Sequence, residues 1–203
     1  MSKNYTELTP FEFFKRCLHV EVVRSNHDFT WGRVIRRYYR NPHIRYQLKW
    51  RFAAYLHARD TKSSKKLAAW INRRLQRTYN VEIMLGAFIA PGLRIAHHCG
   101  IVVNDKCRIG ENFHIHQNTT IGSKKGPAEF IIIGDNVTIG AHSCIIGHQL
   151  TIGHNVTIGA ATFLNKDVPD NVTYFTKRES VAVEKVIELN PHLSIESAYT
   201  AQL

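Results

Sequence analysis

A six-residue period constrains this chain more than any other feature. From Leu85 onward, every sixth residue is usually aliphatic and the residue after it is usually Gly or Asn. The leading positions are Leu85, Pro91, His97, Val103, Ile109, Ile115, Ile121, Pro127, Ile133, Ile139 and Ile145, and then, after one extra residue, Ile152, Ile158 and Leu164. Helices and strands repeat every ~3.6 and ~2 residues, so neither explains this spacing. Period six is typical of the hexapeptide repeat of a parallel β-helix, whose corners favour residues that tolerate positive φ.

The chain divides into three parts by pattern. We expect a basic α-helical region at 1–80, a left-handed β-helix at 81–170, and a tail at 171–203 with a short amphipathic helix near Val181 to Leu189. The predicted fold class is therefore α+β, with N-terminal helices followed by a left-handed parallel β-helix. We expect roughly four to five coils, in which residues about eighteen apart lie above one another.

The first eighty residues carry helix signals. Thr9, Pro10 and Glu12 form a capping box with proline at the first helical position, and the residues Phe11, Phe14, Leu18 and Val22 follow on one predicted face. A second helix is expected after Asn41-Pro42, from about 43 to 59. A third is expected from a cap at Ser63-Ser64 to about Tyr79.

Positive charge is concentrated in this helical region. The net charge is +11, and the segment from Arg33 to Arg77 holds fourteen Lys or Arg residues against one acid, Asp60. Such a block favours nucleic acid, an anionic membrane surface or a phosphorylated ligand as partner. The alternative interpretation is a solvated helical face with no partner.

Other classes are disfavoured by composition. No segment approaches the ~20 apolar residues of a membrane-spanning helix, and the N-terminus lacks a basic stretch followed by an apolar run, so a cytoplasmic protein is expected. The four cysteines, Cys17, Cys99, Cys107 and Cys144, show neither a CxxC pair nor zinc spacing. We expect buried, reduced thiols.

The string RIAHHCGIVV breaks the repeat. His97 stands at a leading, inward position, where a partly buried imidazole needs hydrogen-bond partners. His98 and His116 stand eighteen residues apart in the slot that favours Gly or Asn. They either serve a functional site, where such rule-breaking is expected, or simply turn corners in left-handed backbone. No nearby carboxylate completes a metal site with the three histidines, so no metal is expected.

These strings resemble a known family. VEIMLGAFIAPGLRIAHHCGIVV, IHQNTTIGSKKG and IGDNVTIGAHSCIIG are similar to segments of the serine O-acetyltransferases and their saccharide-modifying relatives. The resemblance covers about residues 30–170. It implies a left-handed β-helix O-acetyltransferase that uses acetyl-CoA, works as a homotrimer with sites between adjacent subunits, and in some cases pairs its trimers.

The resemblance also implies roles for individual residues. His97 matches the family's catalytic base, and Glu82, fifteen residues upstream, matches the carboxylate that orients it. His98 and His116 become candidates for binding the acceptor. The residues matched to coenzyme A binding are Gly122, Ser123, Lys124, Lys125, Ala141, Ala160 and Lys166.

Two departures from the family pattern bear on the acceptor. Ala96 stands where serine-acetylating members carry Asp, and Phe130 stands near the place of a further His. We therefore expect the acceptor to be a saccharide hydroxyl, in a bacterial surface polysaccharide or its lipid-linked precursor. One alternative is serine acetylation with an altered acceptor pocket. The other is a non-catalytic β-helix module that binds nucleic acid, which the paired lysines and the His97 and Glu82 spacing disfavour.

Overall fold

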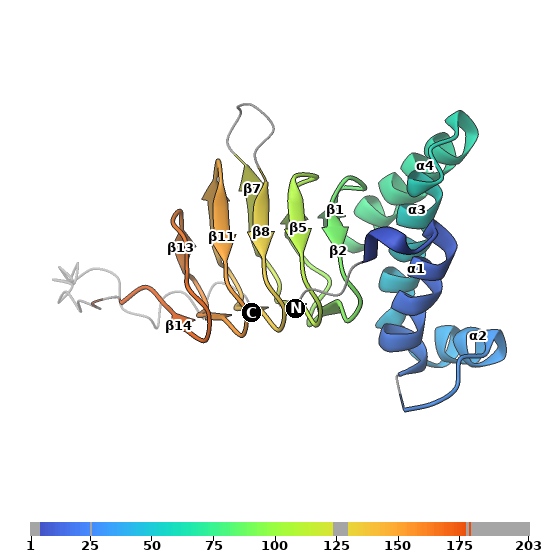
Figure 1. The fold of residues 1–203 in the computed structure, drawn as a ribbon, viewed down its shortest axis with the longest axis horizontal. Coiled ribbons are helices and arrows are strands. Elements are labelled where there is room, and N and C mark those ends of the chain that lie inside the picture. The colour runs from blue at the N-terminus through green and yellow to red at the C-terminus, as the bar shows by residue number, and fades with distance from the viewer. Residues whose placement is uncertain (1–4, 25, 124–129, 178, 180–203) are drawn as a thin grey trace, which may run out of the picture.

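The computed structural model describes residues 5–24, 26–123, 130–177 and 179, and shows helices covering one end of a β-helix (Figure 1). The predicted fold class is confirmed. The expected helix near Val181 to Leu189 lies outside the described residues. The helical elements are η1 (Tyr5–Glu7), α1 (Pro10–Leu18), η2 (His19–Val23), α2 (Trp31–Arg40), α3 (Ile44–Ala58) and α4 (Lys62–Tyr79). Among the described residues, none of these helices has the length and apolar character needed to cross a bilayer.

The helix starts follow from short polar side chains. The predicted capping box is present, since the Thr9 hydroxyl accepts from Glu12 N at 3.3 Å and Thr9 N donates to the Glu12 carboxylate at 2.9 Å. The third long helix begins one turn earlier than expected, because Thr61 rather than Ser63-Ser64 is its cap. Of the predicted apolar face, Phe11 is 47% exposed, while the other three residues are buried.

Helix α2 was not among the expected elements. Thr30 caps it, its hydroxyl accepting from Arg33 N at 3.3 Å, and Val34 is its one buried residue. Val34 joins a small apolar cluster with residues of α1 and η2, which are Phe14, Leu18, Val22 and Val23. The helical part therefore has a core of its own, beside the larger core that runs through the β-helix.

The β-helix has three parallel sheets, one on each side of the coil. Sheet A contains β1 (Val81–Ile83), β4 (Ile101–Val103), β7 (Thr120–Ser123), β10 (Cys144–Gly147) and β13 (Phe163–Leu164). Sheet B contains β2 (Phe88–Ile89), β5 (Cys107–Ile109), β8 (Ile131–Ile133) and β11 (Leu150–Ile152). Sheet C contains β3 (Arg94–Ile95), β6 (His114–Ile115), β9 (Thr138–Ile139), β12 (Thr157–Ile158) and β14 (Thr173–Tyr174).

The coils differ in length, contrary to the uniform eighteen residues expected. Along sheet A, Val103 pairs with Ile121, eighteen residues later. Ile83, however, pairs with Val103 across twenty residues, and Ile121 pairs with Ile145 across twenty-four. Because each sheet side keeps its strand register, the two extra residues of the first coil lie at a corner.

One aliphatic residue from each short strand fills the interior, and polar ladders fix a corner. The inward isoleucines of the strands, such as Ile109 and Ile139, are almost fully buried. At the corner between sheets B and C, asparagine amides bond from coil to coil at 2.9–3.0 Å, along the column Asn112, Asn136, Asn155 and Asn171. All four have positive φ, between 55 and 59°. Asparagine tolerates this backbone better than most residues. These asparagines stand three residues after an inward residue, as Asn136 does after Ile133, so they do not account for the Gly that directly follows it. That glycine allows close approach of the next coil, since a Cβ on Gly134 would lie 2.7 Å from the carbonyl carbon of Gly153, which corrects the expectation of positive φ at that position.

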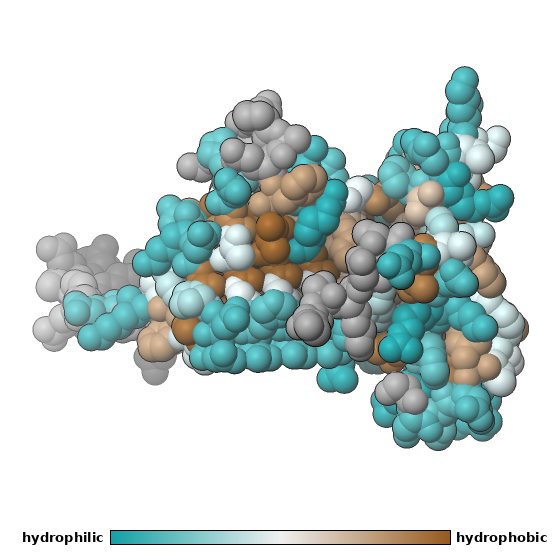
Figure 2. All heavy atoms as spheres, viewed as in Figure 1, coloured by the Kyte–Doolittle hydropathy of each residue, from teal (hydrophilic) through white to brown (hydrophobic). Residues whose placement is uncertain are grey.

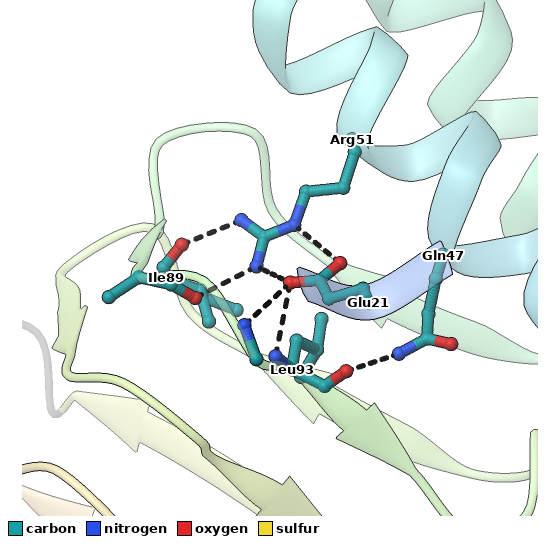
Figure 3. Close-up of polar contacts among 7 residues, drawn as sticks. Glu21, Gln47, Arg51, Ile89 and Leu93 are labelled. Carbon is teal, nitrogen blue, oxygen red and sulfur yellow. Dashed lines mark hydrogen bonds and ion pairs between the residues drawn. The ribbon is translucent and has the colours of Figure 1, made fainter. Parts of the chain in front are cut away.

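A buried ion pair joins the helices to the first coil (Figure 3). Arg51 on α3 bonds to the carboxylate of Glu21 on η2, and the two side chains are 3% and 1% exposed. Arg51 also donates to the carbonyls of Ile89 at 2.6 Å and Ala90 at 2.9 Å. Glu21 accepts from the backbone amides of Gly92 and Leu93, each at 3.1 Å. The pair therefore also satisfies four backbone groups of the first coil.

Other helix side chains complete the contacts with the first coil. The Trp50 indole donates to Ile83 O at 3.0 Å, and the Asn72 amide donates to the same carbonyl at 3.3 Å. The Gln47 amide donates to Leu93 O. These carbonyls point away from the second coil, so the helices take the place that a preceding coil would otherwise have.

The cysteines form no disulfide among the described residues. Cys17 and Cys107 are buried as expected, and burial raises the pKa of each thiol to about 12. Cys99 is exposed and Cys144 is partly exposed, which corrects the expectation of four buried thiols. Cys99 differs because it lies in the corner described next.

Candidate functional site

The two neighbouring histidines lie in an insertion at the corner between sheets C and A. Ala96 and His116 occupy equivalent places, since Ala96 N donates to Ile115 O and His116 N donates to Ile139 O, one coil further. Gly100 and Asn118 are also equivalent, with positive φ of 62 and 54°. In the first coil three residues lie between Ala96 and Gly100. In the second coil only Gln117 lies between His116 and Asn118. The first coil therefore has two extra residues here.

This insertion corrects the inward positions assigned to the first coil. The inward residues are Ile83, Ile89 and Ile95, rather than Leu85, Pro91 and His97. Counting back in sixes from Val103 passes over the insertion and shifts the frame by two residues. His97 is consequently exposed, instead of partly buried inside the coil.

His98 turns toward the helices. Its ring lies between Tyr46 of α3 and Tyr79 of α4, with ring centroids 5.3 and 5.8 Å away. Its Nε2 is buried and has no hydrogen-bond partner within the described part of the chain. Burial lowers the pKa of His98, and the neighbouring His43 and His97 lower it further. The neutral ring thus anchors the insertion, while His97 is left outside; acceptor binding by His98 stays a prediction.

His116 does not stack on His98, which corrects the predicted eighteen-residue relation. It stacks on Ala96, and its ring lies 4.6 Å from that of His114 on the outer face of sheet C. Burial lowers the pKa of His114, with smaller contributions from His116 and Arg94. His116 therefore lies beside the insertion at the same corner, one coil further along.

Glu82 lies on the outer face of sheet A, next to the same corner. It is the middle residue of β1, with its Cα paired to Val102. It lines a shallow recess of about 150 Å³ together with Gln76, Asn80 and Gly100. Between residues 26 and 123, no hydrogen bond or ion pair joins Glu82 to His97. The expected pair of base and orienting carboxylate is thus near one corner but not in contact.

Two of the predicted cofactor residues continue this corner along the coil axis. Ala161 N donates to Ala141 O at 2.7 Å, and His142 N donates to Gln117 O at 3.1 Å. Ala141 and Ala160 therefore follow Gln117 in one column, and this column begins at the insertion. Both alanines retain solvent exposure. We name this column, with His97 to Cys99 at its start, the histidine corner.

Of the other predicted cofactor residues, Gly122 and Lys166 lie toward the opposite edge of sheet A. Gly122 is in β7, where an added Cβ would lie 3.1 Å from the Ile146 side chain. Lys166 follows β13 and is exposed, with its ammonium 5.7 Å from the Tyr174 ring centroid. Ser123 ends β7, and Lys124 and Lys125 lie outside the described residues. The outer face of sheet A separates this edge from the histidine corner.

Some features of the site had no signal in the repeat. Tyr46 and Tyr79 lie outside the period, so their contact with His98 follows only from the tertiary structure. Phe130, which stands where the family pattern has His, packs under Arg108, whose guanidinium carbon is 4.2 Å from the ring centroid. The described residues contain no group of three or more His, Cys, Asp or Glu side chains arranged to hold a metal ion.

Comparison with known proteins gives relatives of one kind. The chain is 36% identical over 115 residues to serine acetyltransferase 3, mitochondrial, of Arabidopsis thaliana, covering 56% of this chain and 29% of that protein. It is 38% identical over 88 residues to the serine acetyltransferase of Staphylococcus epidermidis, covering 42% and 41%. The soybean serine acetyltransferase apoenzyme superposes with a TM-score of 0.57 at 30% identity, covering 64% and 54%. No family model matches the chain.

These findings show that the chain is similar to serine acetyltransferases in part of its sequence and in its fold. It spans less than half the length of the two curated relatives. The prediction of a saccharide acceptor, and with it a role in polysaccharide synthesis, is wrong in light of these relatives, which are serine acetyltransferases. Ala96 and Phe130 were therefore overinterpreted as evidence for a changed acceptor.

Proposed function

We propose that this protein is an acetyl-CoA-dependent O-acetyltransferase that transfers an acetyl group to the hydroxyl of serine. One observation carries the proposal: His97 projects from the insertion at the head of a corner column that continues through Ala141 and Ala160. An exposed imidazole on the first coil thereby shares a corner with small residues on the third and fourth coils, and Gln117 lies between them on the second. The acceptor is proposed from the relatives, which are named serine acetyltransferases.

The histidine corner fits an extended thioester ligand. The small side chains of Ala141 and Ala160 leave the backbone open to close approach, and Lys166 offers an exposed cation at the far corner of sheet A. A phosphate-bearing ligand that crosses the outer face of sheet A would reach both corners. Acetyl-CoA, when bound, supplies the acetyl group as an activated thioester.

His97 is proposed as the general base. A neutral imidazole accepts a proton from a hydroxyl when the two groups lie within hydrogen-bond distance. As the serine oxygen attacks the acetyl carbonyl, the hydroxyl proton passes to His97. The thioester C–S bond then breaks, and His97 returns the proton to the leaving thiolate of coenzyme A, which gives O-acetylserine and free coenzyme A. Glu82 is proposed to orient the imidazole through a hydrogen bond that forms on substrate binding, since such contacts are often long in the free enzyme.

We also propose that the protein is a homotrimer, in which a neighbouring subunit completes the site. The outer faces of the sheets expose several large apolar side chains, which are Phe88, Ile132 and Phe163. Hydrophobic residues are visible on the flank of the β-helix below β7 in Figure 2. Scattered exposed apolar residues are common, but a flank of this kind favours burial between subunits. Sedimentation velocity, with a trimer as the expected species, tests this.

The test of the function is release of coenzyme A from acetyl-CoA with L-serine as acceptor, followed by chromatography so that the protein's own exposed Cys99 does not interfere. We expect His97→Ala to lower kcat by about 10²- to 10⁴-fold, the range typical of a lost general base. The matched control is His154→Ala, because His154 is an exposed histidine at the corner between sheets B and C.

Two other outcomes would contradict separate parts of the proposal. Acetyl-CoA binding by calorimetry without turnover of serine would reject the acceptor while keeping the donor. Equal turnover by wild type and His97→Ala would reject His97 as the base.

A further inference from the structure

A recess lined by arginines lies in the helical part of the molecule and shares no residue with the histidine corner. It has a volume of about 480 Å³ and is formed by Val23, Arg24, His27, Arg33, Arg36, Arg37, Arg40 and Asn41. Helix α2 supplies four of these arginines and contains no acid. Within the described residues, none of the five arginines pairs with a carboxylate. Uncompensated guanidinium groups around a hollow favour an anionic ligand, and phosphate in particular.

Helix α2 also exposes a row of apolar side chains. Trp31, Ile35 and Tyr39 recur every fourth residue and are 45%, 57% and 71% exposed. Residues four apart lie on one side of a helix, so these three form a stripe. Val34 is the one buried residue of the helix, and the inner side of Trp31 also contacts the rings of Phe14 and Phe29. A helix that is rich in Arg and carries a Trp-containing apolar stripe is typical of elements that lie in the interface of a membrane.

The position of α2 suits such a contact. Figure 1 places α2 at the outer edge of the helical part, projecting away from the β-helix. Figure 2 shows mainly hydrophilic residues over α2, with hydrophobic residues beside them. A flat surface could therefore reach α2 without meeting the β-helix.

The observations favour a membrane over two other occupants. A second copy of this chain would bring two sets of five arginines together, which is costly without anions between them. Nucleic acid would match the charge, but its binding gains nothing from an exposed aliphatic residue such as Ile35. An anionic bilayer matches both features, because it offers phosphates and an apolar layer within one helix diameter.

We propose that α2 and the segment before it bind the surface of a membrane that contains anionic phospholipids. The arginine recess receives lipid phosphates, and the stripe of Trp31, Ile35 and Tyr39 enters the layer between headgroups and acyl chains. This inference does not rest on the proposed acetyl transfer, because its evidence comes from α2 and the residues beside it in the recess, and the variants that test it leave the histidine corner unchanged.

The test is co-sedimentation of the whole protein with vesicles of phosphatidylcholine alone and with vesicles containing added phosphatidylglycerol. We expect binding only to the anionic vesicles, weakening as salt is raised. A triple variant, Arg33→Ala, Arg36→Ala and Arg40→Ala, should bind on the order of a hundredfold more weakly. The matched control removes three exposed cations of α4, by Lys66→Ala, Arg73→Ala and Arg77→Ala. It should lose much less binding.

The apolar stripe is tested separately. Ile35→Ser should weaken binding about tenfold, because a half-exposed aliphatic side chain no longer leaves water. In a Trp70→Phe background, Trp31 is the exposed indole beside the buried Trp50, and its emission should shift to the blue on anionic vesicles. Unchanged unfolding midpoints would show that the variants remain folded.

Several outcomes would overturn the inference. Equal loss of binding by the two triple variants would mean that net charge alone acts. Equal binding to neutral vesicles would reject phosphate recognition. Tighter binding to duplex DNA than to anionic vesicles, or self-association that the α2 variants abolish, would assign the surface to nucleic acid or to a second copy instead.

Discussion

Replacing Glu21 by Gln tests how the helices hold the first coil. The change keeps the shape of the side chain but leaves the Arg51 charge buried without its counter-ion, and Arg51 is only 3% exposed. At present both carboxylate oxygens of Glu21 accept hydrogen bonds, from Arg51 and from the backbone amides of Gly92 and Leu93. In the variant the amide N–H₂ replaces one of these oxygens, so a donor faces a donor and that hydrogen bond is lost. Breaking a buried pair from one side costs about 3–5 kcal/mol.

The measurement is chemical and thermal unfolding. At this chain length each kcal/mol lowers the midpoint by roughly 2–4 °C, so Glu21→Gln should lower Tm by roughly 6–20 °C. The control is Lys65→Ala, which removes the exposed ion pair with Asp60. Solvent and salt screen that pair, so its midpoint should not change measurably.

A double replacement separates two explanations. An isolated buried ion pair can often be exchanged for apolar residues at little cost. Here Glu21→Leu with Arg51→Met would also leave four backbone groups of the first coil without hydrogen-bond partners. Each such group costs about 1–3 kcal/mol when it is buried and unpaired. We therefore expect a loss of at least about 4 kcal/mol. A double variant as stable as wild type would refute the argument that the pair holds the coil edge.

Three further predictions concern the histidine corner and the thiols. Since the folded-state pKa of His98 is lowered, the unfolded state binds the proton first, so stability should fall as pH drops below about 6.5, and His98→Phe should flatten this dependence in pH-resolved urea unfolding. Ellman's reagent should modify Cys99 in the native protein and reach Cys17 only on unfolding; acetyl-CoA should slow the reaction at Cys99 if the donor lies along the corner. Gly100→Ala should destabilise the protein measurably by thermal unfolding, because φ is +62° there and an added Cβ would meet the Asn118 side chain; an unchanged midpoint would contradict the assigned corner.

The repeat predicted the architecture, because a period of six over many units has few physical explanations. It did not predict the register of the first coil. A periodic interpretation assumes coils of equal length. The two-residue insertion is marked only by departures from the repeat, which are Pro91 and His97 at positions that favour aliphatic residues and His98 at a position that favours Gly or Asn. The histidine corner could not be assembled for the same reason, since its members align only when the coil lengths are known.

Helix α2 was missed for a different reason. Amphipathic helices are recognised by an apolar face directed at a core, yet only Val34 of α2 is buried. Its other apolar residues, such as Ile35 and Tyr39, face solvent and give no pattern that points inward. The contact of His98 with Tyr46 and Tyr79 likewise depends on how the helices meet the first coil, which local pattern does not encode.

The contacts that Trp50, Arg51 and Gln47 make with the first coil bear on how the protein avoids polymerising. Strands of a β-helix end in rows of open carbonyls and amides, which are a template for another chain. The helices occupy these groups on all three sides of the first coil, at Ile83, Ile89 and Leu93. A chain beginning at residue 81 would present the same row bare, and elongation of fibrils from that end would then be limited only by encounter between molecules.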